Sequence, residues 1–292
     1  MYRTTNALLL AALLSSACQS QTNPGTNPND DGGGGGGGKD QGSAPTMLGE
    51  LQVTTIRDLN SDRFPTQTHV QVTGVVQSPG AAAYAVQFDQ GCLYELFVVQ
   101  ADPSPSLKDG IAVRYLQRNV ATGDMMIRSA DCQQLAAGLE IGKSPRGTQV
   151  EIQGILTVQN GIHSIDLGSL GRVKNQGRAQ TQPQPVPVTA AMLPSGGVNS
   201  APPGAAFVGA YGALVSFQNV ITSDSHAVTQ TFRVSAAAGD TNKTRVSTTY
   251  LRILDSNYAP PADGTTYKSV TGIVTIDSGG SILPRGGDDL VP

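Results

Sequence analysis

The residues of this chain that could carry chemistry are its cysteines, histidines and neighbouring carboxylates. The stretch "SDSHAV" (Ser223 to Val228) brings Ser, Asp and His together, as in a hydrolase triad. Triad members meet in space rather than in sequence, and the serine usually sits on a tight turn such as G-x-S-x-G, which this chain lacks. The stretch therefore predicts a hairpin with an exposed histidine.

The acidic pair Asp288-Asp289 is the second candidate for chemistry. Cleavage by two carboxylates needs them to face each other across a substrate, whereas neighbours in a strand point to opposite faces. We expect Arg285 and Asp288 to form a structural ion pair instead. The sequence predicts no catalytic site, no metal site and no cofactor, and so a protein that is not an enzyme.

Cys92 and Cys132 are two of the three cysteines, and they fall in the same half of the chain. In an oxidising compartment such a pair predicts a disulfide. The alternatives are two free thiols, or a zinc site that would need four ligands from scattered histidines.

The first residues have the form of an export signal. Arg3 is followed by the apolar run "ALLLAALL", which is too short to span a bilayer but suits a cleaved signal peptide over residues 1–17. Small residues then lead to Cys18. This pattern resembles the lipobox of bacterial lipoproteins, although Ser15 stands where that motif usually has Leu. The resemblance implies an acylated Cys18 and a membrane partner through that lipid; the alternative is an ordinary secretory signal.

Residues 18–48 predict a disordered tether. They are rich in Asn, Pro, Gly and Asp and include seven consecutive glycines, Gly32 to Gly38. Such a segment buries too little apolar surface to offset the entropy of ordering, and it would span about 30 Å as a flexible coil. In lipoproteins, Gln after the cysteine, here Gln19, implies the outer membrane. We therefore expect a location in the cell envelope, with secretion as the alternative.

The remaining chain has the pattern of an all-β protein. Short runs of β-branched and aromatic residues end at Gly, Pro, Asn or Asp, as in "THVQVTGVVQSPG" and "TYLRILD". Only residues 131–142 suggest a helix. The Pro- and Gln-rich residues 176–188 predict a linker between a first domain, 49–175, and a second, 189–292. The sparse basic cluster 171–178 is interpreted as a solvated linker.

An internal repeat relates the two halves. "TQVEIQGILTVQNG" (Thr148 to Gly161) aligns without a gap with "TYKSVTGIVTIDSG" (Thr266 to Gly279). Asn160-Gly161 between apolar residues is a strong hairpin signal. A glycine inside a strand marks the sharp bend at a barrel corner. Each half therefore predicts a small antiparallel barrel of five or six strands.

Three stretches resemble the OB-fold-like domains of exported bacterial proteins. These are "TTIRDLNSDRFPTQTHVQVTGVV", "AAAYAVQFDQG" and "SVTGIVTIDSGGSILPRGGDDLV". The resemblance implies two tandem OB-like β-barrels, a fold that hosts many functions. Ligands of such barrels often stack on exposed aromatic side chains. Because the chain has no Trp, the predicted ligand platforms are tyrosines, with core packing as the alternative: Tyr84, Tyr94, Tyr115, Tyr250 and Tyr258.

The charge balance bears on the partner. The net charge is −3 and no concentrated basic face is visible, which disfavours nucleic acid. We predict a non-enzymatic, membrane-anchored envelope lipoprotein that binds an external glycan or protein. The alternatives are a hydrolase or accessory module of a secreted nuclease, and a structural spacer in an envelope assembly.

Overall fold

A computed structural model describes residues 49–79, 85–88, 91–117, 132, 134–135, 139–168, 171–195, 204–276 and 279–292. The predicted signal peptide, Cys18 and the tether lie outside the described residues, as does Tyr84. Within the described part, no helix has the length and apolar character needed to cross a membrane.

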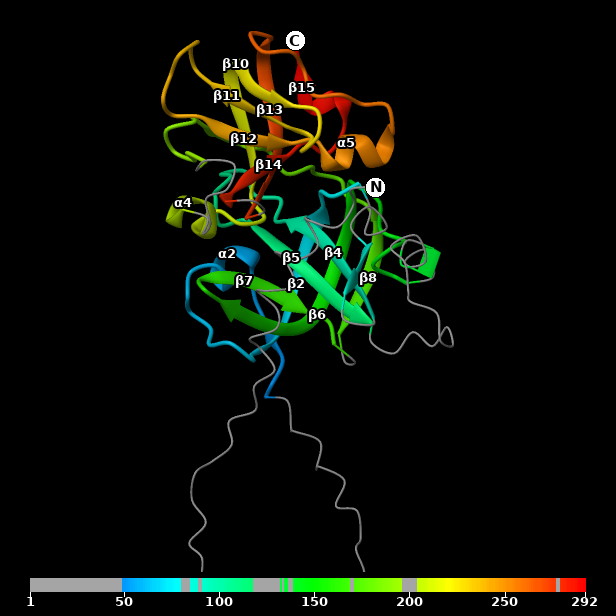
Figure 1. The fold of residues 1–292 in the computed structure, drawn as a ribbon. Helices are drawn as coiled ribbons and strands as arrows, with labels where there is room; N and C mark the ends of the chain where they lie inside the picture. The colour runs from blue at the N-terminus through cyan, green and yellow to red at the C-terminus, as the bar shows by residue number, and fades with distance from the viewer. Residues whose placement is uncertain are drawn as a thin grey trace, which may run out of the picture. The chain divides into compact units, whose positions relative to one another are not determined.

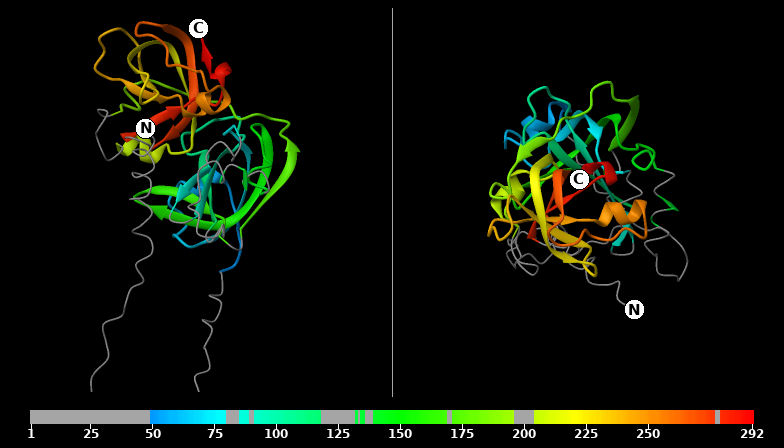
Figure 2. Two further views of the ribbon diagram at one scale, coloured as in Figure 1. Left: turned by 45° about the vertical axis from the view of Figure 1, so that its right-hand side comes forward. Right: turned by 90° about the horizontal axis from the view of Figure 1, so that it is seen from above.

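The first eight strands form one sheet that curls into a barrel (Figures 1 and 2). The barrel closes in the order β2-β4-β5-β7-β6 and back to β2, with β5 and β7 parallel and the other neighbours antiparallel. The strands are β1 (Gln52–Val53), β2 (His69–Val76), β3 (Ala85–Phe88), β4 (Gly91–Val99), β5 (Gly110–Gln117), β6 (Thr148–Gln159), β7 (Ile162–Asp166) and β8 (Arg172–Arg178).

The other seven strands form a second sheet with the same connectivity. It closes in the order β10-β11-β12-β14-β13 and back to β10, and its third and fifth barrel strands, β12 and β14, are again parallel. This is the strand order of an OB fold, so the predicted all-β class with two tandem OB-like barrels is confirmed. The strands are β9 (Val186–Val188), β10 (Leu214–His226), β11 (Thr231–Ser235), β12 (Thr244–Ser247), β13 (Thr266–Thr275), β14 (Ser281–Leu283) and β15 (Leu290–Val291).

The helices described are short: α2 (Ile56–Leu59), α4 (Ala205–Gly209), α5 (Thr249–Leu254) and the 3-10 turn η4 (Gly287–Asp289). The prediction of a strand at "TYLRILD" is wrong, because these residues form α5. Its buried residues, Tyr250 and Leu251, are adjacent, and so short an apolar run fits either structure. In the predicted helix 131–142, the described residues Cys132, Gln134 and Leu135 are helical.

The internal repeat marks equivalent strands. β6 and β13 each lie between the first and last strands of their barrels. Gly154 and Gly272 occupy the same repeat position, and a Cβ at either would lie 2.5 or 2.6 Å from an isoleucine methyl of the last strand, Ile165 or Ile282. Both barrels therefore need glycine where these two strands cross closely.

The hairpin predicted at Asn160-Gly161 is also confirmed. Both residues have positive φ, 53° and 76°, as a type I′ turn between β6 and β7 requires. The ends of the sheets differ from the predicted ranges. β8 covers most of the basic cluster interpreted as linker and runs to Arg178, and β9 lies inside the expected linker 176–188. Pairing with β6 and β10 holds these polar segments as strands.

Candidate functional site

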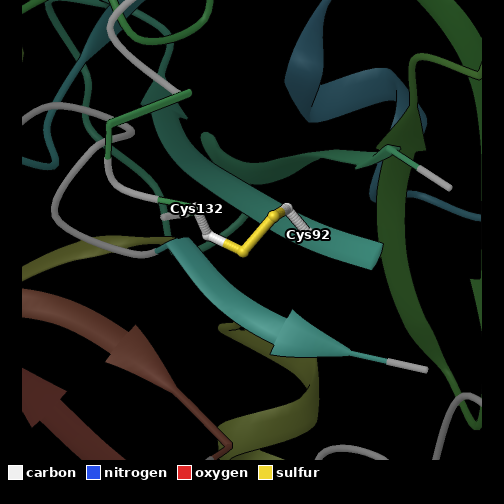
Figure 3. The surroundings of a disulfide bond; sticks show 2 residues. All are labelled: Cys92 and Cys132. Atoms are coloured by element: carbon white, nitrogen blue, oxygen red, sulfur yellow. A yellow bond between two sulfur atoms is a disulfide. The ribbon is translucent and has the colours of Figure 1, made fainter. Parts of the chain in front are cut away.

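The predicted disulfide is confirmed. Cys92 at the start of β4 is bonded to the helical Cys132, with the Cα atoms 5.5 Å apart (Figure 3). Both residues are fully buried in the first core. The bond joins a barrel strand to the segment that connects β5 with β6, so it braces the first barrel rather than forming a reactive site.

Two of the predicted platforms are wrong. Tyr94 and Tyr250 are fully buried, so neither ring can stack on a ligand. Tyr115 is partly buried, and its ring is stacked on Tyr94 with the centroids 6.0 Å apart. The core alternative therefore applies to Tyr94 and Tyr115, because a barrel this small uses its large rings as filling, whereas Tyr250 is buried in an apolar cluster between the barrels.

The outer face of β4 and β5, the face with which OB folds commonly bind ligands, is covered in the first barrel. Phe97 and Ala112 lie on it, and they pack in one apolar cluster with Tyr211, Tyr250 and other residues of the second barrel. Phe97 meets the Tyr211 ring edge to face, with the centroids 5.7 Å apart. This face is therefore a contact surface between the barrels, within the compact unit Glu50–Pro292.

A buried polar network lies beside this cluster. Arg114 donates from Nε to Glu95 Oε2 at 2.7 Å and from Nη2 to the Tyr211 hydroxyl, also at 2.7 Å. Tyr211 in turn donates to the same Glu95 oxygen at 3.1 Å. Burial by itself lowers the pKa of Arg114, but the electrostatic interactions and hydrogen bonds with Tyr211 and Glu95 outweigh it and raise that pKa, so the guanidinium stays charged.

The barrels also touch through their backbones. A Cβ on Gly110, at the start of β5, would lie 2.0 Å from the carbonyl oxygen of Gly212, which precedes β10. Only glycine at position 110 permits this approach.

Ion pairs at the C-terminal end extend the same contact. Arg146 of the first barrel binds Asp288 at 3.0 Å, and its hydrogen bond lowers the pKa of that carboxyl. The prediction that Arg285 pairs with Asp288 is wrong, because each of them has another partner. Arg285 binds Asp289 at 2.6 Å and also donates to Gln77 of the first barrel.

A groove of about 420 Å³ lies on the second barrel. Its lining includes Asn219 and Ile221 of β10, Tyr267 and Lys268 of β13, and the C-terminal Pro292. Residues 236–238, directly after β11, complete one wall. The volume falls in the range of small-ligand sites, and the lining combines apolar side chains with an aromatic ring, an amide and an ammonium group.

One tyrosine, Tyr267, lines the groove, and a second, Tyr258, is its neighbour. Tyr267 is half-buried, and burial raises its pKa. Burial, and secondly the neighbouring Tyr267 phenol, raise the pKa of Tyr258 to about 12. Tyr258 is thus the predicted platform that the structure places next to the groove, and both phenols stay neutral hydrogen-bonding groups at physiological pH.

The face next to the groove is close to neutral. Ile221 of the groove pairs with Ser235, and two residues further along the ladder Ser223 pairs with Arg233. Asp224 lies 3.9 Å from the Arg233 Nε and 3.0 Å from the Lys243 Nζ. Lys243 also acts electrostatically on Asp263, a second carboxylate. Because these two carboxylates offset the two cations, the face suits a neutral polar ligand better than a polyanion.

Tyr267 was not among the predicted site residues. A signal for it existed in the repeat, where Gln149 of the first barrel aligns with Tyr267 of the second. An aromatic residue at a position that is polar and half-exposed in the sister barrel indicates an added contact surface.

No protein-family model matches the sequence, and no curated protein matches it. Several solved structures are similar, among them the following three. The OB domain of Ta0387 from Thermoplasma acidophilum has 13% identity and a TM-score of 0.23 over 46% of this chain and 92% of that one. A replication protein A heterotrimer bound to single-stranded DNA has 9% identity and a TM-score of 0.25, and the match covers 80% of this chain and 54% of that one. A deletion mutant of the single-stranded DNA binding protein from Thermus aquaticus has 14% identity and a TM-score of 0.19, and the match covers 75% of this chain and 92% of that one.

Proposed function

We propose that this protein is a non-enzymatic envelope lipoprotein that binds a glycan in the groove of its second barrel. The observation that carries the proposal is the unequal use of the two barrels. The face of β4 and β5 is occupied by the second barrel, whereas the groove beside Tyr267 is open to solvent. The first barrel thus serves as a platform and the second as the binding barrel.

The chemistry of the groove supports a sugar. Sugar rings present apolar C–H faces and a rim of hydroxyls. The Tyr267 ring can stack on such a face, while Asn219 and Lys268, both exposed, can bind hydroxyls. The near-neutral surroundings favour a glycan over nucleic acid, whose binding depends on releasing counterions from a basic surface.

The proposal includes the location. Acylation of Cys18 would hold the barrels at the outer membrane, and the glycine-rich residues 18–48 would let them reach ligands beyond its surface. Mass spectrometry of the mature protein tests this directly. We expect an acylated amino-terminal cysteine, and a Cys18→Ala variant that leaves the membrane fraction. An unmodified amino terminus on a freely soluble protein would refute the anchor.

Glycan binding is tested with residues 19–292 on a glycan array, followed by calorimetry with the sugars found. Tyr267→Ala should weaken binding roughly thirtyfold, as for the loss of an aromatic anchor worth about 2 kcal/mol, and Tyr267→Phe should retain most of it. Lys268→Ala should also weaken binding, because it removes a donor to the sugar hydroxyls. The control is Lys174→Ala, which removes an exposed lysine of the first barrel and should leave binding unchanged. Retention on a DNA or heparin column at physiological salt, with no sugar bound, would overturn the proposal.

A further inference from the structure

Strand β8 ends its sheet and has one open edge. It pairs with β6 over Gln153–Thr148, and no other strand of the described residues pairs with it. A strand in this place presents backbone N–H and C=O groups to solvent, which makes it a template for another extended chain.

The strand is firmly seated but widely exposed. Val173 is 6% exposed and anchors β8 in the first core, whereas every other residue of β8 is exposed. The register shifts near Thr148, and Gly177 has a φ of 90°, so the regular part of the edge runs over residues 172–175. This length lies within the usual range for a strand, about three to ten residues.

The exposed side chains of β8 make this edge positively charged. Arg172, Lys174 and Arg178 are all exposed, and none forms an ion pair within the part of the chain that the structure describes. One carboxylate, Glu151, stands opposite Lys174 in the ladder. With one carboxylate for three cations, the strip keeps a positive excess, unlike the face beside the groove, where Asp224 and Asp263 offset Arg233 and Lys243.

The charges decide which chain can pair here. A second copy of β8 would bring arginine and lysine against arginine and lysine, and like charges on paired strands destabilise a ladder. An acidic chain would gain charge-assisted contacts on the same rungs. A nucleic acid could bind the positive side chains, but it has no peptide N–H and C=O groups to form hydrogen bonds with the open edge.

We infer that the free edge of β8 docks an extended acidic segment of a partner protein by adding a strand to the first sheet. The backbone groups supply the ladder, and Arg172 and Lys174 select acidic side chains at alternate positions. This surface lies on the first barrel, so it works independently of the groove on the second.

The test uses the protein from residue 19 to 292 and a fluorescein-labelled peptide of alternating Glu and Thr, about eight residues long. Fluorescence anisotropy should show saturable binding that weakens with salt. The same peptide with alternate N-methylated residues should not bind, because it cannot complete a ladder. An alternating Lys and Thr peptide should not bind either.

The double variant Arg172→Glu and Lys174→Glu should weaken binding of the acidic peptide on the order of tenfold or more. The matched control, Lys108→Glu and Arg252→Glu, changes the net charge equally at exposed positions outside β8 and should leave binding unchanged. Thermal unfolding of both variants checks that the fold is retained. Equal losses in both variants, undiminished binding of the N-methylated peptide, absence of saturable binding, or a dimer that the β8 variant abolishes would each overturn the inference.

Discussion

Glu95 and Arg114 stand opposite each other on β4 and β5, and the Arg114 Nε lies 2.7 Å from the Glu95 Oε2 on the face covered by the second barrel. The phenol of Tyr211, from the other barrel, contacts both groups. A charged pair on a strand face would normally be solvated and contribute little. Here it is enclosed, so it holds the two barrels in one arrangement.

We expect Glu95→Gln to destabilise the protein by about 3 kcal/mol, because it leaves the partly buried Arg114 charge without its carboxylate. Tyr211→Phe should cost about 1–3 kcal/mol, since it removes one hydroxyl from the same network. Urea unfolding measures both. The control is Asp58→Asn, which breaks the exposed pair with Arg63 and should cost less than about 1 kcal/mol. A loss no larger than that of the control would contradict the enclosed network.

Gly110→Ala should destabilise the contact between the barrels. The added methyl would lie 2.0 Å from the Gly212 carbonyl oxygen, so one backbone must move, at a cost of about 1–3 kcal/mol. Gly209→Ala is the matched control, because a Cβ there meets nothing within 4 Å. Differential scanning calorimetry of the two variants decides the matter. Equal melting temperatures would mean that the two backbones are not held together.

Removing the disulfide should cost about 4 kcal/mol in the chain-entropy account, given the sequence separation of 40 residues between Cys92 and Cys132. The measurement compares unfolding of the wild type with that of the double variant Cys92→Ala and Cys132→Ala. Adding reductant to the wild type should reproduce the loss, and it should not affect the variant. Alkylation of these two thiols in the unreduced, denatured protein would show that the bond does not form.

Stability should fall at high pH through Tyr258. The folded phenol has a pKa of about 12, above its usual value of about 10, so the folded state holds the proton more tightly. This contribution is complete below pH 10 and is lost as the pH rises through 12. Since the ring is partly exposed, we expect at most about 1 kcal/mol. Tyr258→Phe should remove this share of the pH dependence, and unchanged curves for the variant would contradict it.

Much of the architecture was predictable because its signals are local. The alternation along Thr148–Gln159 and the Asn160-Gly161 turn specify a hairpin whatever surrounds them. The repeat of that strand in the second half predicted a second barrel of the same kind. The α5 helix was missed because Tyr250 and Leu251 are buried in the same way by a helix or a strand.

The site residues depended on the tertiary structure. Tyr94 and Tyr258 were both predicted as ligand platforms, yet closure of the first barrel buries Tyr94 completely, while Tyr258 lies beside the groove. Gly110 meets Gly212, and Arg146 meets Asp288, across large separations in sequence. No local pattern contains such pairings.

By itself, the sequence determined most of the strands, the turns and the repeat, since period and turn chemistry act between near neighbours. It favoured a bond between Cys92 and Cys132 but left free thiols and a zinc site as alternatives. Only the tertiary structure decided which barrel face is covered and which tyrosine stays accessible. Those outcomes follow from how two closed sheets pack on each other, and packing is settled by contacts between residues far apart in the chain.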